Sequence, residues 1–273
     1  MSNDAQGLTG HRNGAAMLPP ALLVWSGKGG VGKSTIAANL AVALTARGVD
    51  VGYLDADLHG PSASTLFGLK DRLSVRGRRI VPAVRNGVGI VSTSLLADPE
   101  HAYVWRGALL RGVLHQLVHD TDWGKRQLIV VDMPPGTGEI QMALLDELDC
   151  MGAVVVTTPQ DLSLADVRRS ARMLIDAEVP VLSVVENMSS ASCPQCACSF
   201  QPLPGDAGLQ VHAMFPEALL VRVPMDLLTA EAAQSGRPQI SIDAAVTTAL
   251  GRSLAQVSDR ILPRVQHHST ASL

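Results

Sequence analysis

Two hydrophobic patterns alternate along this chain. Short, nearly continuous apolar runs are typical of buried strands, and longer stretches with an apolar residue every three or four positions are typical of helices. The predicted strands lie at 22–25, 51–55, 127–132, 153–159 and 179–185, and the predicted helices at 34–47, 105–119 and 162–177. Strands and helices that alternate at this spacing predict right-handed crossovers and a parallel sheet. We therefore expect a doubly wound α/β fold, with a mainly parallel sheet and helices on both of its faces.

The same pattern divides the chain into three parts. Residues 1–20 are expected to form a disordered lead, residues 21–264 a single domain, and residues 265–273 a flexible tail. The remaining predicted elements are a hairpin at 79–84, strands at 89–93 and 218–223, a helix that ends near Cys150, and a last helix at about 244–261. The last helix is mildly amphipathic but has no lysine-rich face, so it is expected to pack against the domain and not on a membrane.

Composition narrows the class of protein. Hydrophobic residues make up 47% of the 273 residues and aromatic residues only 3%, so the core must be aliphatic, as in sheets covered on both faces. The net charge of −3 and the pI of about 6.2 give no basic footprint for nucleic acid. No apolar run approaches the roughly 18 residues of a membrane span, and the polar N-terminus is unlike a secretion signal. We therefore expect a cytoplasmic protein that binds neither nucleic acid nor membrane.

A glycine-rich loop follows the first predicted strand and leads directly into the first helix. The segment from Gly27 to Ser34 has the spacing of a phosphate-binding loop, in the strand–loop–helix context that this motif requires. Glycines let backbone N–H groups converge on a phosphate, and the helix N-terminus adds partial positive charge. Lys33 is expected to reach the β- and γ-phosphates, and the Ser34 hydroxyl to ligate Mg²⁺. The predicted nucleotide-binding residues here are Gly27, Gly29, Gly30, Val31, Gly32, Lys33, Ser34 and Thr35.

A second lysine makes this loop unusual. Lys28 follows the first glycine, and a second ammonium beside a cationic loop is costly unless an anion balances it. The sequence KGGVGKS resembles the deviant phosphate loop of the superfamily that contains ParA, MinD, ArsA and the nitrogenase iron protein. In that superfamily the first lysine reaches across a dimer interface to the partner's nucleotide. The resemblance implies a homodimer in which Lys28 takes part in catalysis.

Polar side chains close several of the predicted strands. Asp55 and Asp57 follow the second strand, Asp132 ends the strongest buried strand, and Asn187 follows a later one. Because ligands of open α/β sheets bind at the carboxyl ends of the strands, we expect Asp57 either to polarise an attacking water or to hold Mg²⁺ through water. Asp132 is expected to orient Mg²⁺ or its water shell. Asp55 fits a helix cap as well as a functional role, and Asn187 suits an adenine edge as well as a turn. The turn-rich segment 133–139 is expected to be a switch that senses the γ-phosphate.

Three of the four cysteines lie between residues 193 and 198. Cys193 and Cys196 form a C-x-x-C pair, which supplies two thiolates where structural zinc and four-iron clusters usually take four. The pair is therefore half of a site completed by a second subunit, or is joined by Cys198, or is redox-active. In a two-fold dimer, one such pair per subunit gives four sulfurs about the axis. The ligand count favours a metal or cluster half-site, which needs the same dimer as Lys28.

In combination, these motifs resemble the Mrp/ApbC/NBP group of iron–sulfur cluster carrier ATPases, which have the P-loop NTPase fold. The resemblance rests on SGKGGVGKST, LDADLHGPS, WRG, VVDMPPGTGE, VVTTPQDLSLADVRR, VVENMS and CPQC, which follow in the group's order over residues 21–200. It implies a Mg²⁺-dependent ATPase dimer that holds a [4Fe–4S] cluster at its interface and passes it to apo-proteins. The implied roles are catalysis by Lys28, Lys33 and Asp57, adenine contact by Asn187, magnesium binding by Ser34 and Asp132, and cluster binding by Cys193 and Cys196.

Several positions depart from the group's pattern. Gln195 lies inside the cysteine pair and Ala197 and Cys198 follow it, where the group has histidine and glycine, so Cys198 could compete as a ligand. Glu139 stands where the group has aspartate. Two other interpretations stay open. One is a MinD- or ParA-like positioning ATPase, which needs a membrane helix or a basic DNA face, and the other is a regulatory ATPase with structural zinc.

Overall fold

A mainly parallel sheet forms the centre of the molecule. The computed structural model describes residues 18–96, 108–160, 164–193, 195–238 and 248–271. Within them the strands follow the order β10-β9-β8-β1-β7-β2-β6-β5, and β11 also pairs with β9. The pairs are parallel except β5 on β6 and β10 on β9. The bounds are β1 Ala21–Trp25, β2 Val51–Asp55, β5 Ala83–Arg85, β6 Val88–Ser92, β7 Leu128–Asp132, β8 Cys150–Thr157, β9 Val181–Ser192, β10 Ser199–Phe200 and β11 Leu219–Met225.

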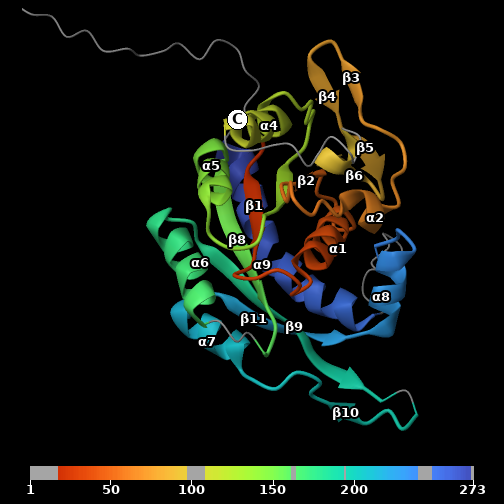
Figure 1. Ribbon diagram of the computed structural model, residues 1–273, viewed down its shortest axis with the longest axis vertical. Coiled ribbons are helices and arrows are strands. Elements are labelled where there is room, and N and C mark those ends of the chain that lie inside the picture. The colour runs from red at the N-terminus through yellow and green to blue at the C-terminus, as the bar shows by residue number, and fades with distance from the viewer. Residues whose placement is uncertain (1–17, 97–107, 161–163, 194, 239–247, 272–273) are drawn as a thin grey trace, which may run out of the picture.

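Helices cover both faces of this sheet (Figure 1). On one side lie α1, α2, α8 and α9, and on the other α4, α5, α6 and α7. Their bounds are α1 Lys33–Thr45, α2 Ala63–Phe67, α4 Ala108–His119, α5 Glu139–Glu147, α6 Leu164–Asp176, α7 Ala207–Met214, α8 Leu227–Gln234 and α9 Ala249–Ala271. A short hairpin of β3 (Ser74–Arg76) and β4 (Arg79–Val81) stands apart from the sheet. The expected α/β fold class is confirmed.

The central strands are buried along their whole length. Every residue of β1, β2 and β7 is buried, which matches the aliphatic runs that predicted these strands. The register places Asp132 opposite Val24 on one side and opposite Asp55 on the other. Because the three strands are parallel, their carboxyl ends meet at one edge of the sheet. Two acidic residues and the start of the glycine-rich loop therefore lie together there.

Some predicted elements differ from the observed ones. Cys150, expected near a helix end, is the first residue of β8. The hairpin predicted at 79–84 is wrong, because β4 pairs with β3 while β5 pairs with β6. Pro82 lies between β4 and β5, where its missing N–H and fixed φ suit a break between strands. The helices predicted from residues 105 and 162 are observed from Ala108 and Leu164, and the residues before these starts lie outside the described part.

The two ends of the domain also differ from expectation. Residues 1–17 lie outside the described part, but Pro20 accepts a hydrogen bond from the Ile129 N–H (2.9 Å), so the last residues of the predicted lead join the domain. The last helix continues to Ala271 and Val265 is buried, so the expected flexible tail is helical through residue 271. Its apolar side packs against the domain as predicted, through Leu250, Leu254, Val257 and Ile261. None of the helices in the described residues is long and apolar enough to cross a membrane.

Candidate functional site

The glycine-rich loop forms a cradle between β1 and α1. Gly32 is the N-cap of α1 and has a left-handed φ of 83°, which favours glycine. A Cβ at Gly32 would lie 2.3 Å from the Asn187 amide nitrogen, so a side chain has no room there. The loop encloses a cavity of about 190 Å³. Its lining residues are Ser26, Lys28, Gly29, Gly30, Gly32, Lys33, Ser34, Thr35, Asp57 and Pro135. Of the predicted loop residues, Gly27 and Val31 lie outside this lining, and Val31 is buried.

Lys33 lies beneath this cavity in a buried ion pair. Its ammonium contacts the Asp132 carboxylate, and the Lys33 and Asp132 side chains are only 6% and 0% exposed. The Tyr53 hydroxyl donates to the same carboxylate (3.2 Å), and the Lys33 ammonium also donates to the Ser34 hydroxyl (3.4 Å). Burial raises the pKa of Asp132, and the Lys33 ammonium partly offsets that effect. Because burying both charges is costly, this pair is suited to exchange partners when a phosphate reaches the loop.

Asp55 is the second buried carboxylate of the site. It caps the N-terminus of α2 and also binds the loop after β2, so the helix-cap interpretation is supported. Burial, and then the neighbouring Asp132 charge, raise the pKa of Asp55 to about 7, although backbone N–H groups oppose the shift. The groups that donate to it are the N–H groups of Ser62 (2.9 Å), Ala63 (2.9 Å) and Asp57 (3.2 Å) and the Ser92 hydroxyl (3.1 Å).

Asp57 and Lys28 lie at the open side of the loop. Asp57 is half-buried, lines the loop cavity and accepts a hydrogen bond from the Gly60 N–H (3.2 Å). Lys28 is exposed and, among the residues that the structure describes, has no ion-pair partner. Both side chains are thus accessible from solvent, unlike Lys33 and Asp132.

The sequence placed Asn187 at a strand end, but β9 continues to Ser192, so that prediction is wrong. Asn187 is 9% exposed, and its amide nitrogen donates to the Val31 carbonyl (2.9 Å). It therefore fastens the glycine-rich loop to β9. It also lines a second cavity of about 180 Å³, which shares Gly32 and Thr35 with the loop cavity.

The far wall of this second cavity comes from the end of β11, the residue that follows it, and α8. It is formed by residues 223–226, 229 and 233, which carry mainly apolar side chains. No sequence motif predicts this wall, because a strand followed by a helix carries no nucleotide motif. The two adjoining cavities give a polar, glycine-rich part for phosphates and an apolar part for a flat ring.

The cysteines lie at the end of the β9–β10 hairpin, which projects from the body of the molecule (Figure 1). The Cys193 N–H donates to the Cys198 carbonyl (2.9 Å), and the Ala197 N–H donates to the Cys193 carbonyl (2.8 Å). Ala197 has a left-handed φ of 57°, so the chain turns back sharply between Cys196 and Cys198. A left-handed φ favours glycine, so glycine would be less strained than alanine at position 197.

The thiols of this hairpin differ from the fourth cysteine. Cys196 is exposed, and hydrogen bonds from the Cys198 backbone, the Cys198 side chain and the Cys193 side chain lower the pKa of its thiol. Burial, followed by the Asp149 charge, raises the pKa of Cys150 to about 12. Because the thiolate is the metal ligand, Cys196 is better suited to bind a metal than Cys150.

One strand connects the loop and the cysteines. Asn187, which contacts the loop, and Cys193 are six residues apart. Between them β9 continues to Ser192, but Met188 has a left-handed φ of 57° and the register of β9 against β11 shifts there. At the usual rise of a strand, six residues span about 20 Å. The two candidate sites are therefore separate but are connected by the same strand.

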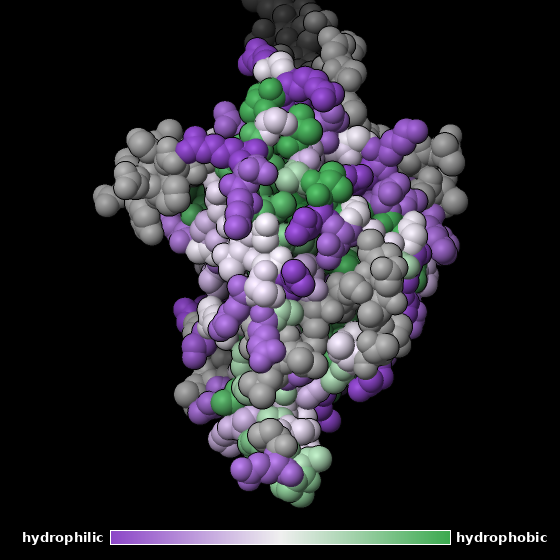
Figure 2. Space-filling model, turned by 90° about the vertical axis from the view of Figure 1, so that its right-hand side faces the viewer, coloured by the Kyte–Doolittle hydropathy of each residue, from purple (hydrophilic) through white to green (hydrophobic). Residues whose placement is uncertain are grey.

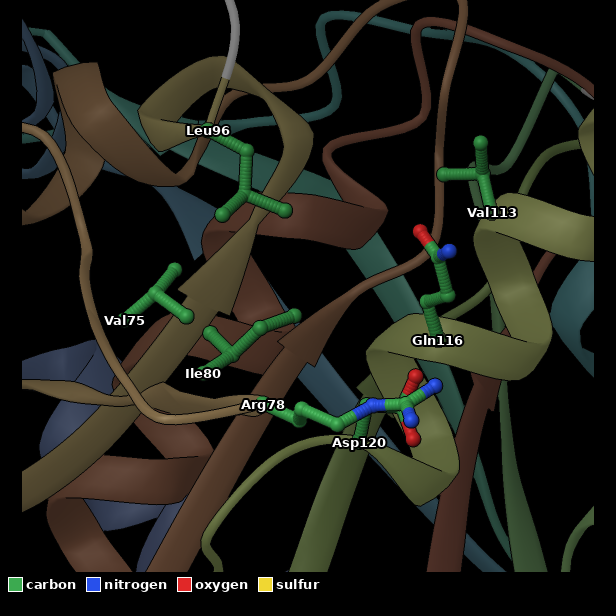
Figure 3. A pocket seen from close by; sticks show the side chains of 7 residues that line it. All are labelled: Val75, Arg78, Ile80, Leu96, Val113, Gln116 and Asp120. Carbon is green, nitrogen blue, oxygen red and sulfur yellow. The ribbon is translucent and has the colours of Figure 1, made fainter.

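A further cavity lies elsewhere in the molecule, between the β3–β4 hairpin and α4 (Figure 3). It measures about 500 Å³, and Arg78 extends across it toward Asp120. Apolar side chains gather in the upper part of the face seen in Figure 2, surrounded by hydrophilic ones. No residue of the glycine-rich loop lines this cavity, so it is not part of the nucleotide site.

Similarity to known proteins shows the family of the chain that carries this loop and this cysteine hairpin. A family model described as "ParA: NUBPL iron-transfer P-loop NTPase" matches residues 19–262. The chain belongs to this family of iron-transfer P-loop NTPases. An iron–sulfur cluster carrier protein of Pseudomonas fragi is 40% identical over 233 residues, which are 84% of this chain and 81% of the relative. The corresponding proteins of Aquifex aeolicus and Salmonella typhimurium are 42% and 41% identical, but the match spans only 60% and 64% of their lengths.

Solved structures of nucleotide-binding proteins share this fold. A nucleotide-binding protein from Archaeoglobus fulgidus, solved in complex with ADP, has a TM-score of 0.70 and 31% identity, over 80% of this chain and 87% of its own. MinD of Pyrococcus horikoshii, solved with Mg-ADP, has a TM-score of 0.63 and 22% identity, over 89% and 96%. The MinD likeness shows the fold alone, which agrees with the mainly parallel sheet of this iron-transfer NTPase.

Proposed function

We propose that this protein is an ATP-hydrolysing iron–sulfur cluster carrier. In the proposal it binds ATP with Mg²⁺ in the glycine-rich loop, holds a [4Fe–4S] cluster between two copies of the chain, and passes the cluster to apo-proteins. The observation that carries the proposal is that β9 joins two features: it contacts the phosphate loop through Asn187, in the middle of the strand, and it leads into the exposed cysteine hairpin at its end. The names of the relatives, iron–sulfur cluster carrier proteins, support it.

The buried ion pair suggests how a nucleotide is bound. The β- and γ-phosphates replace Asp132 as the partner of Lys33, and the backbone N–H groups of the loop hold the phosphate oxygens. The freed Asp132 carboxylate and the Ser34 hydroxyl are oxygen donors of the kind that Mg²⁺ prefers, so the residues fit this ion. Mg²⁺, when bound there, neutralises charge on the phosphates. The apolar cavity beside Asn187 accepts the adenine ring.

Hydrolysis then requires a water molecule in line with the γ-phosphate. Asp57 lines the loop cavity from its open side, so its carboxylate is placed to orient that water. Lys28 is exposed and lacks an ion-pair partner within the described residues, which suits an ammonium that contacts the nucleotide of a second copy. Lys28 and Lys33 together stabilise the negative charge that develops on the phosphates.

The cluster is the cargo of the proposed reaction. Cys193 and Cys196 of each copy supply two sulfurs, so a two-fold dimer completes a four-sulfur site. The lowered pKa of Cys196 favours the thiolate that binds iron. Since β9 connects the loop to the hairpin, a nucleotide-dependent change at Asn187 is transmitted toward the cysteines.

Anaerobic purification tests this function. The absorption spectrum and the iron, sulfide and zinc contents are measured for the unchanged chain and for the double variant C193S/C196S, with C150S as the matched control. The proposal predicts a cluster in the unchanged chain and in C150S, its loss in the double variant, and retained ADP binding in all three. A cluster retained by the double variant contradicts the cysteine assignment, and zinc without iron favours the regulatory ATPase.

A further inference from the structure

A cluster of metal-ligating side chains lies away from both proposed sites, where α4 packs against α5. His115 and His119 are one turn apart on α4, and Glu147 is the last residue of α5. Nδ1 of His115 lies 3.2 Å from each carboxylate oxygen of Glu147, and Nε2 of His119 lies 2.5 Å from one of them. One ligand atom from each residue lies within 4.8 Å of the others.

This donor set matches a known coordination chemistry. Two histidines four residues apart on a helix face the same way, and two imidazoles with one carboxylate bind zinc in many open sites. Tetrahedral bonds of about 2.1 Å place neighbouring ligand atoms roughly 3.4 Å apart. The His115–Glu147 separation already matches this spacing, and the His119–Glu147 separation must lengthen by about 1 Å. We propose that His115, His119 and Glu147 bind a divalent transition metal ion of the zinc class.

The metal-free arrangement is consistent with such a site. The two imidazole rings are 4.4 Å apart at their centroids, and a nitrogen of each ring faces the Glu147 carboxylate. Burial raises the pKa of Glu147, but hydrogen bonds from His119 and His115 outweigh it, and the net effect lowers that pKa. The carboxylate is therefore ionised at neutral pH. The side chains are 58% (His115), 34% (His119) and 32% (Glu147) exposed, so an ion can enter from solvent and keep a water as its fourth ligand.

The position of the cluster suggests what the ion does. Val113 and Gln116 of α4 and Asp120, which follows its last residue, line the cavity of Figure 3, on a different side of the helix from the two histidines. The helix α5 begins at Glu139, directly after the turn-rich segment whose Pro135 lines the loop cavity. An ion held by Glu147 ties the end of α5 to α4. The ion thus restrains α5, the helix that follows the turn-rich segment beside the loop cavity.

The test uses the full chain without a histidine tag, in the C193S/C196S/C198S background, so that the hairpin thiols cannot take the metal. Zn²⁺ is titrated by calorimetry and Co²⁺ by absorption spectroscopy. We expect one ion per chain, with the weak visible bands of nitrogen and oxygen ligands and no thiolate band. Zn²⁺ should raise the melting temperature in proportion to its binding.

Variants assign the ligands. H115A/H119A should abolish binding, and E147Q should weaken it by at least about tenfold. The matched control is H267A/H268A, which removes two adjacent histidines of α9. Residues next to each other on a helix point in different directions and do not share one ion. The control should therefore still bind one ion per chain. Circular dichroism checks that each variant is folded, and H119Q replaces the double variant if that one unfolds. Absence of binding in the cysteine-free background, or equal binding by H115A/H119A or H119Q, overturns the proposal.

Discussion

The buried carboxylate of Asp55 predicts an unusual pH dependence of stability. Burial and the neighbouring Asp132 raise its pKa from 3.8 to about 7. Between these two values the folded protein holds a proton on Asp55 that the unfolded chain releases. Protonation therefore stabilises the fold fully below the unfolded pKa, and this stabilisation is lost as the pH rises through the folded pKa.

The magnitude follows from the size of the shift. A shift of about three pKa units corresponds to about 4 kcal/mol over the whole range. Between about pH 5 and pH 8, the Asp55 contribution to the free energy of unfolding falls by about 2.5 kcal/mol. Most acidic residues act in the opposite sense, since ion pairs lower their pKa values and stabilise proteins as the pH rises.

Urea unfolding at a series of pH values measures this effect. The free energy of unfolding of the unchanged chain is compared with that of D55N, whose amide oxygen can still accept from the backbone of α2 but does not titrate. D57N, changed two residues away at the open side of the loop, is the matched control. The free energy of unfolding of D55N minus that of the unchanged chain should increase by about 2.5 kcal/mol from pH 5 to pH 8. D57N should follow the unchanged chain over the same range. Parallel curves for D55N and the unchanged chain would refute the described electrostatics of Asp55.

Three further predictions concern the loop and the thiols. Gly32→Ala places a Cβ against the Asn187 amide in a left-handed conformation, so it should weaken ADP binding by at least about tenfold in calorimetry; unchanged affinity contradicts the tight packing. Asn187→Ala removes the hydrogen bond to Val31 and should lower the free energy of unfolding by about 1 kcal/mol, as urea denaturation would measure; no change would show that this bond does not hold the loop. Iodoacetamide at neutral pH should label Cys196 well before Cys150 in peptide mass spectrometry, and equal rates contradict their opposite pKa shifts.

The glycine-rich loop could be predicted because its signal is local. The apolar run of β1, the glycines and the start of α1 are contiguous in the sequence, and each part has a direct physical reason. The same holds for Asp132, which ends the strongest apolar run of the chain. The fold class also followed, since alternating strands and helices leave few possible topologies.

Features that depend on distant residues could not be predicted. The raised pKa of Asp55 arises first from its burial in the fold and then from its register opposite Asp132, and no local pattern encodes either. The second half of β9 is polar, so the apolar pattern ended the strand too early and placed Asn187 at its end. The local pattern predicts only a helix for His115 and His119. Glu147 contacts them because α5 packs against α4, which no local pattern encodes.

The proposed function requires that a cluster joins two copies of this chain through the cysteine hairpin. Native mass spectrometry of the anaerobically reconstituted protein measures this directly. The account predicts a species with two chains and one four-iron, four-sulfide cluster, which is absent from the C193S/C196S variant and present in C150S. A cluster bound to a single chain, or a dimer of the same mass in the C193S/C196S variant, would contradict it.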